Sequence, residues 1–250
     1  MAIWKKFHKD GTPEYLARNY WWAYIWGFSI WFWDHEPLVN MILFGNYKKL
    51  VKKTLERFKR IKPKKTLHIT AVYGSITPDL AKQIKGDNEQ GEYHLIDITQ
   101  GQLDAAAKKL KAQPETEDQL KNLIRMNAEN LSYDDNSFDA SLIFFLLHEL
   151  PPEARRNVLA EAVRVTEPGG HLIITEYGER TKTHFFHTFW PSRKILGFFE
   201  PYVPGFIEED LDAVLAECAE RSSKKVVNTH KELVFKGFYR NYEYRIENKD

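Results

Sequence analysis

The chain has 250 residues, of which 43% are hydrophobic, so it can bury the core of one large domain, or of one domain with an arm. Its net charge of +1 leaves no basic excess for a nucleic-acid partner. Cys218 is the only cysteine, which excludes a disulfide within the chain and indicates a reducing compartment. We expect no signal peptide, and no run of about 20 apolar residues spans a membrane as a plain helix.

Residues 1–62 are predicted to form a helical arm, or lid, of unusual composition. Residues 20–33 are apolar on nearly every side over about four helical turns, which is too short to cross a bilayer. Two interpretations remain open: the segment packs into the core, or it lies in a membrane interface or walls a pocket for an apolar ligand. Nearby lysines would suit an anionic lipid surface. The arm holds six of the seven tryptophans: Trp4, Trp21, Trp22, Trp26, Trp31 and Trp33.

The arm is expected to contain a second helix, capped by Asp34 and with Pro37 in its first turn. After it comes the stretch 66–77, which predicts a strand over residues 67–72, a tight turn at residues 73–75 and a new helix. We expect Thr77 to cap this helix and Pro78 to lie in its first turn. A strand, turn and helix N-terminus of this kind can form a nucleotide-binding crevice, although an ordinary connecting turn has the same pattern.

Strands alternate with helices along the rest of the chain, which predicts an α/β fold with a mostly parallel sheet. The strand 92–98 contains Asp97 near its end, where an acidic side chain commonly binds ribose hydroxyls; an aspartate on a surface loop is the alternative. Strand 138–147 is followed by His148 and Glu149. Strand 171–175 is followed by Glu176. Ligands in such sheets bind at the carboxyl ends of the strands, so these polar groups indicate one site.

Four segments carry a family resemblance: Phe138-Asp-Ala, the strand before His148, the helix ending at Val165, and Thr166-Glu-Pro-Gly-Gly-His-Leu-Ile-Ile. Over residues 66–177 the chain resembles class I S-adenosylmethionine-dependent methyltransferases of the quinone-biosynthesis branch. The resemblance implies a Rossmann-like, seven-stranded, mostly parallel sheet in residues 63–250, closed by a terminal hairpin. The family's cofactor loop has an acidic residue and three small ones. Here those positions fall on His68, Thr70, Val72 and Gly74.

The altered loop is similar to that of the rhodoquinone biosynthesis proteins, as are the segments Tyr20-Trp-Trp-Ala-Tyr24, Leu38-Val-Asn40, Gly45-Asn-Tyr47 and Phe144-Phe-Leu-Leu-His-Glu149. This resemblance implies that ubiquinone becomes rhodoquinone when an amino group replaces a ring methoxy group. It also implies S-adenosylmethionine as the nitrogen donor and a divalent metal, manganese. The expected location is cytoplasmic and peripheral at the inner membrane, or on the matrix side of a mitochondrion.

The resemblance assigns cofactor-binding roles to Val72, Tyr73, Gly74, Asp97, Asn127, Ala128 and Phe144. The bulk of Val72 and Tyr73 predicts that the α-amine of the cofactor, rather than its methyl group, faces the quinone ring. The amine must lose a proton, and His148 is the candidate general base because imidazole titrates near neutral pH; a capping or core histidine is the alternative. Tyr73 is expected to line the cofactor or the quinone. Candidate manganese ligands are Glu149, Glu176, His184 and His187.

Two other functions remain open at this stage. One is an ordinary S-adenosylmethionine-dependent methyltransferase acting on a quinone or another small molecule. The other is a catalytically silent binding or scaffold protein that keeps the fold without the chemistry. The sequence leaves the oligomeric state undetermined.

Overall fold

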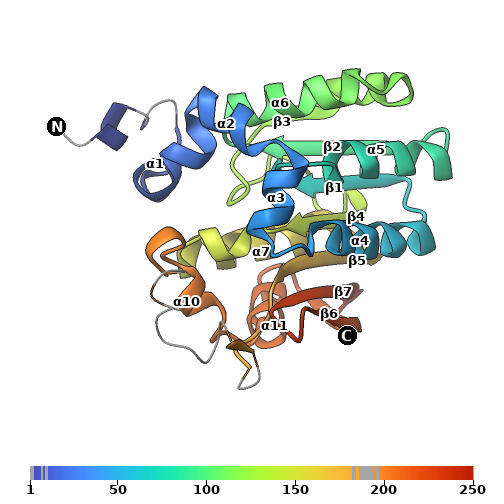
Figure 1. The fold of residues 1–250 in the computed structure, drawn as a ribbon. Helices are drawn as coiled ribbons and strands as arrows, with labels where there is room; N and C mark the ends of the chain where they lie inside the picture. The colour runs from blue at the N-terminus through green and yellow to red at the C-terminus, as the bar shows by residue number, and fades with distance from the viewer. Residues whose placement is uncertain are drawn as a thin grey trace. The chain divides into compact units, whose positions relative to one another are not determined.

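The computed structural model describes residues 3–6, 8, 11–181, 184–185, 194 and 197–249. Its seven strands follow the order β3-β2-β1-β4-β5-β7-β6 (Figure 1). The strand pairs β1–β2, β2–β3 and β4–β5 are parallel, whereas β7 runs antiparallel to both β5 and β6. The predicted α/β fold with a mostly parallel sheet is therefore confirmed. The chain divides into two compact units, Met1–Ala128 and Glu129–Asp250.

In the first unit, three parallel strands end at the same edge. β1 (Lys65–Ile69), β2 (Glu92–Asp97) and β3 (Leu123–Arg125) lie in register, with Ile69 beside Ile96 and Asp97 beside Arg125. β1 stops at Ile69, before the predicted end of the strand at residue 72, because Thr70 turns the backbone with φ of +79°. The residues that follow the three strands are therefore neighbours in space.

The longest helix of the first unit among the described residues presents one apolar stripe and one polar face. α4 (Tyr47–Ile61) buries Leu50, Val51 and Phe58 while its lysines face solvent. The others are α5 (Ile76–Asp87), α6 (Gln100–Lys111) and the 3₁₀ segment η3 (Pro114–Asn122).

The arm consists of several short helices, so the expectation of one continuous apolar helix is wrong. The backbone at Trp26 is extended, with ψ of 118°, and this breaks the run between a π-helical segment and α2. Asp34 does not cap the next helix, which begins after His35; its carboxylate binds elsewhere in the unit. The described elements are η1 (Ile3–Lys6), α1 (Glu14–Tyr20), η2 (Trp21–Ile25), α2 (Gly27–Trp33) and α3 (Glu36–Ile42).

In the second unit, β4 (Phe138–Phe144) pairs in parallel with β5 (Thr166–Tyr177). β7 (Tyr239–Asn248) runs antiparallel to β5 and to β6 (Lys224–Val234), which confirms the predicted terminal hairpin. The described helical elements of this unit include η4 (Leu147–Glu149), α7 (Pro152–Val165), α10 (Val203–Phe206) and α11 (Leu211–Glu220). Among the described helices, none is both long and apolar enough to cross a membrane.

Candidate functional site

The turn between β1 and α5 contains two residues with positive φ. Thr70 has φ of +79° and Gly74 has φ of +85°. A β-branched residue rarely adopts this conformation, whereas glycine does so without strain. Thr70 falls on one of the small-residue positions of the methyltransferase loop, so the backbone of this turn keeps a glycine-like shape even where the side chain has changed.

Tyr47 occupies the N-terminus of α5. The backbone N–H groups of Ser75 and Ile76 donate to its hydroxyl oxygen at 2.6 and 3.1 Å. The same hydroxyl donates to the carbonyl of Tyr73 at 3.3 Å, and burial raises the pKa of Tyr47 to about 12, so it keeps its proton. The prediction that Thr77 caps this helix is therefore wrong: Thr77 is the second helical residue, and a side chain from α4 takes the cap position.

Asp34 binds the same turn from the arm. The N–H of Gly74 donates to Asp34 Oδ1 at 2.9 Å. Lys109 on α6 lies 2.7 Å from the same oxygen, and its ammonium also donates to the carbonyls of Gly74 at 3.0 Å and Val72 at 3.4 Å. The ion pair is mostly buried, with side-chain exposures of 21% for Lys109 and 16% for Asp34. The arm and α6 thus hold the loop backbone through charged hydrogen bonds.

Tyr73 is held within the first unit as well. Its hydroxyl donates to the carbonyl of Ala23 and accepts from Gln102 Nε2 at 3.0 Å. Its ring stacks on Tyr24 with 5.6 Å between centroids. The bulk that the sequence places at this turn is therefore fixed by the arm and α6 in one orientation.

Asp97 ends β2 and lies 4% exposed beside the loop. Ala71 N–H donates to its Oδ2 at 3.0 Å, and the N–H and hydroxyl of Thr99 donate to Oδ1, each at 2.7 Å. Burial raises the pKa of Asp97 to about 6, although these hydrogen bonds act in the opposite direction. Asn127 and Ala128 follow β3, half-buried, so the first unit brings together the predicted residues at the ends of β1, β2 and β3.

In the second unit, Glu176 orients His148. His148 Nδ1 donates to Glu176 Oε1 at 2.7 Å, and Tyr177 N–H donates to the same oxygen at 2.8 Å. His148 Nε2 then lies 3.8 Å from Glu149 Oε1. Burial lowers the pKa of His148, but the charges of Glu176, Glu200 and Glu149 outweigh burial and raise it to about 9. Glu176 is thus placed as the hydrogen-bond partner of the histidine.

His148, Glu149 and Glu200 form a group suited to a metal ion. One ligand atom from each lies within 4.8 Å of the others. Glu200 was not among the residues predicted from the sequence; its signal, an acidic residue within an aromatic insertion, is weak. His184 instead stacks on Phe238 with 4.7 Å between ring centroids, and His187 lies outside the described residues.

Phe144, at the end of β4, is 2% exposed and packs edge-on against Phe145. The sequence assigned no site role to Tyr47, Lys109 or Gln102. Tyr47 had a signal, because it lies in a segment that carries the family resemblance. Lys109 and Gln102 had none, since both belong to an ordinary amphipathic helix.

Comparison with known proteins agrees with this arrangement. A family model described as a methyltransferase domain matches residues 67–174. The demethylmenaquinone methyltransferase of Geobacillus sp. (strain WCH70) is 30% identical over 153 residues, which are 60% of this chain and 61% of that one. The enzyme of the same name from Bacillus licheniformis is 29% identical over 143 residues, 57% of each chain. The chain thus spans about three-fifths of these relatives.

Solved structures share the fold at low identity. An O-methyltransferase family protein from Burkholderia thailandensis has a TM-score of 0.56 at 16% identity, covering 86% of this chain and 60% of that one. The PH0226 protein from Pyrococcus horikoshii OT3 has a TM-score of 0.55 at 14% identity, covering 94% and 99%. The [4+2]-cyclase SpnF has a TM-score of 0.54 at 17% identity, covering 80% of each. Residues 67–174 are therefore similar to a methyltransferase domain, within a chain that has the class I methyltransferase fold.

Proposed function

We propose that this protein converts ubiquinone to rhodoquinone, using S-adenosylmethionine to replace a ring methoxy group with an amino group. The observation that carries the proposal is the closure of the loop after β1. The backbone N–H groups of Gly74, Ser75 and Ile76 all donate to side chains of the same unit, Asp34 and Tyr47. Helix N-termini of this kind normally offer such donors to a ligand.

The closed loop supports a changed orientation of the donor. In a methyltransferase, glycines let the methionine end of the cofactor approach the turn, and the methyl group points to the acceptor. Here Tyr47 and Asp34 take the donors of the turn, and Tyr73 adds bulk beside them. A methionine end excluded from this position must lie elsewhere, and we propose that its α-amine then faces the quinone ring.

The adenosine end of the cofactor fits the residues present. Asp97 Oδ2 accepts one hydrogen bond among the described residues, and a carboxylate oxygen has room for a second donor such as a ribose hydroxyl. Asn127 offers an amide oxygen to the adenine amine. Both lie at the carboxyl edge of the strands in the first unit, where parallel sheets bind nucleotides.

The group formed by His148, Glu149 and Glu200 fits a divalent cation such as manganese, which accepts imidazole and carboxylate ligands. Glu176 holds His148 Nδ1–H, so Nε2 is the ring atom that would bind a cation. A cation there would withdraw electrons from a quinone carbonyl and favour addition of the amine at the ring carbon that then loses methoxide. Hydrolysis of the bond between the new ring nitrogen and the methionine α-carbon would then leave a free amino group on the ring.

His148 Nε2 has one lone pair and cannot serve as metal ligand and general base together. With a pKa of about 9, the imidazole is protonated at neutral pH and takes no proton from the amine. A cation displaces that proton on binding. The ligand role is therefore the one we propose for His148, in place of the general base expected from the sequence. The ammonium group of the donor then loses one proton to water before it adds, and the adduct gives a second proton to the departing methoxide, which leaves as methanol.

Methyl transfer to a quinone is the second candidate. The names of the relatives favour it, because demethylmenaquinone methyltransferases match more than half of the chain. The fold alone does not decide between the two reactions, since one fold hosts many chemistries and a [4+2]-cyclase shares this one.

One experiment separates the candidates. The purified full chain is incubated with manganese, S-adenosylmethionine that carries heavy nitrogen in its α-amino group and deuterium in its methyl group, and a short-chain ubiquinone or, in a parallel sample, a short-chain quinol that lacks one methyl group and so offers a position for methylation. Loss of a methoxy group with gain of heavy nitrogen supports amino transfer. Gain of a deuterated methyl group establishes the second candidate instead. An unchanged quinone with bound cofactor indicates a silent binding protein, and refutes both reactions.

The closed-loop argument has its own test. In the double variant Val72→Gly with Tyr73→Gly the loop regains space for the methionine end, so we expect amination to fall and methylated product to rise. Amination that is unchanged in this variant would refute the proposed link between bulk and orientation.

A polyprenyl quinone resides in a bilayer, so we extend the proposal to the place of action. The protein is expected to work as a cytoplasmic, peripheral protein at the inner membrane, or from the matrix side in a mitochondrion.

A further inference from the structure

The arm exposes a set of large apolar side chains, which we name the apolar face. Soluble proteins rarely expose such a set together, and where they do it marks a protein or membrane contact. Exposure reaches 56% for Phe28, 62% for Trp31 and 64% for Met41. The apolar face comprises Trp26, Phe28, Trp31 and Phe32 on and beside α2, and Met41 and Ile42 on α3.

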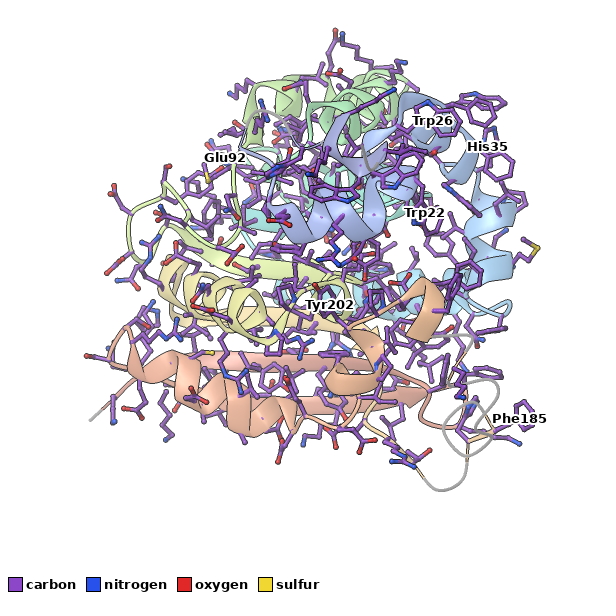
Figure 2. All side chains as sticks on the ribbon, turned by 90° about the vertical axis from the view of Figure 1, so that its left-hand side faces the viewer. Trp22, Trp26, His35, Glu92, Phe185 and Tyr202 are labelled. Atoms are coloured by element: carbon purple, nitrogen blue, oxygen red, sulfur yellow. The ribbon has the colours of Figure 1, made fainter. Side chains whose placement is uncertain are left out.

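The aromatic part of this face is continuous. The ring centroid of Phe28 lies 5.3 Å from that of Trp26, 5.8 Å from that of Trp31 and 6.2 Å from that of Phe32. His35 adds a ring 5.2 Å from Trp31, and Figure 2 shows Trp26 and His35 at the outer side of the arm. The rings therefore form one surface rather than scattered exposed residues.

The two helices are apolar on the side that faces away from the rest of the unit. α2 buries Ser29 and Ile30. Ile30 packs against α6 at Gly101, where its Cδ1 lies 2.7 Å from the position that a Cβ atom would take. α3 buries Val39. A helix in contact with water carries polar residues on its outer side, whereas α2 carries phenylalanine and tryptophan there.

The charges around the face point to an anionic partner. Residues 20–44 contain no lysine or arginine and only two acidic residues, Asp34 and Glu36. Asp34 is paired with Lys109, and Glu36 is paired with Lys48 at 3.1 Å. That second pair places the start of α4 beside α3.

From that start, α4 presents a row of exposed lysines: Lys48, Lys49 and Lys52. An apolar face bordered by lysines complements an apolar layer with an anionic surface. Aromatic rings prefer the headgroup region of a bilayer, and lysines are attracted to acidic headgroups.

We propose that the apolar face inserts into the interface of an anionic lipid bilayer, with Lys48, Lys49 and Lys52 on the headgroups. The helices then lie in the plane of the interface, which is the mode expected for short helices that cannot span it. This inference deepens the proposed function, since the interface is where a lipid-borne quinone is reached, and it rests on that function for its biological meaning.

The test is vesicle flotation of the purified full chain without quinone or cofactor. We expect binding to vesicles of equal parts phosphatidylcholine and phosphatidylglycerol, and at least tenfold weaker binding to phosphatidylcholine alone. The double variant Phe28→Ser with Trp31→Ser should lose binding to both. Its matched control, Phe198→Ser with Phe199→Ser, removes two exposed aromatics of the second unit and should bind as the wild type.

Charge is tested in the same way. The triple variant of Lys48, Lys49 and Lys52 to Gln should lose the preference for anionic vesicles and keep the weak binding to phosphatidylcholine. Its control changes three exposed lysines elsewhere in the first unit, Lys108, Lys111 and Lys121, to Gln, which alters the net charge equally. Equal losses in both triple variants would show a general charge effect and overturn the proposed orientation.

Two further results would overturn the inference. One is a wild-type chain that does not float with anionic vesicles. The other is a stable dimer in solution that Phe28→Ser with Trp31→Ser dissociates, which would identify a second copy as the occupant. Amino transfer to a water-soluble short-chain quinone is measured separately, so failure of the membrane inference and failure of the proposed reaction are distinguished.

Discussion

The ring of Tyr47 fills the space beside Gly74. A Cβ built on Gly74 would lie 2.6 Å from Tyr47 Cζ and closer still to the hydroxyl oxygen. Gly74 therefore meets two requirements together, a φ of +85° and the absence of a side chain. The contacts of this glycine are with the protein itself: its N–H donates to Asp34, and the ring of Tyr47 fills the space that a side chain would take.

Substitution at Gly74 separates the two requirements. Gly74→Ala is expected to lower the free energy of unfolding by about 2–4 kcal/mol, through backbone strain and displacement of Tyr47. Gly45→Ala is the matched control, because Gly45 has φ of +76° and nothing within 4 Å of a built Cβ. It should cost only about 1 kcal/mol of strain. If denaturant unfolding showed that Gly74→Ala and Gly45→Ala lower the free energy of unfolding equally, contact with Tyr47 would not be a reason for glycine at position 74.

Lys109 is predicted to fasten the arm to the loop. Lys109→Met leaves the mostly buried Asp34 carboxylate without its cation and should lower the free energy of unfolding by about 1–3 kcal/mol. Faster hydrogen exchange at the Gly74 amide, which donates to Asp34, reports the loosened contact. Lys108→Met, at an exposed neighbouring position, should change neither measurement. If hydrogen exchange at the Gly74 amide were unchanged in Lys109→Met, Lys109 would not be what holds the arm on the loop.

Replacing Thr70 with glycine should relieve backbone strain and should not destabilise the protein. At Thr70 the φ of +79° strains a β-branched side chain, so Thr70→Gly is expected to leave the free energy of unfolding unchanged or raise it by up to about 1 kcal/mol. Thr66→Gly, in the regular part of β1, should lower it by at least about 1 kcal/mol. If Thr70→Gly lowered the free energy of unfolding as much as Thr66→Gly, the threonine side chain at position 70 would be stabilising despite its backbone conformation.

His68 should make the protein sensitive to acid. Burial, with the charge of Lys109, lowers the pKa of His68 to about 3, and Nδ1 bonds the hydroxyl of Tyr93 at 2.7 Å. Between pH 6.5 and 3 the unfolded chain binds a proton that the folded chain does not. The contribution of neutral His68 to the free energy of unfolding is therefore fully present above pH 6.5. It is lost as pH falls, by about 2 kcal/mol at pH 5.

The variant His68→Gln removes this titration and should flatten the decline in thermal midpoint between pH 6.5 and 5. Asp97, whose pKa burial raises to about 6, acts in the opposite direction in both proteins and so cancels in the comparison. Parallel pH profiles for the wild type and the variant would exclude a buried neutral His68.

The metal group makes a prediction that needs no activity assay. Glu149→Gln and Glu200→Gln should each weaken manganese binding at least tenfold, measured as free manganese by electron paramagnetic resonance. Glu176→Gln should weaken it by about 10- to 100-fold through the orientation of His148. Glu153→Gln, at an exposed position, is the control. Manganese affinity equal in all four variants would rule out this site.

The sequence by itself determined the α/β fold, because buried runs and helical periodicity depend on local pattern. It also placed Asp97 at the end of β2. The strand expected to run to residue 147 stops at Phe144, and His148 lies in η4. The sequence could not assign partners to side chains. Asp34 fits the role of a helix cap locally, but in the structure its carboxylate accepts from Gly74 N–H and pairs with Lys109.

Only the tertiary structure decided what closes the loop after β1 and which carboxylates accompany His148. Tyr47 begins α4, Lys109 lies on α6 and Asp34 directly follows α2. Glu200 lies 51 residues beyond Glu149 in sequence. Their contacts depend on how distant segments pack, which no local pattern records. The physical reason is that hydrogen bonds and ion pairs act over a few ångströms in space, whereas sequence periodicity reports only the neighbours along one helix or strand.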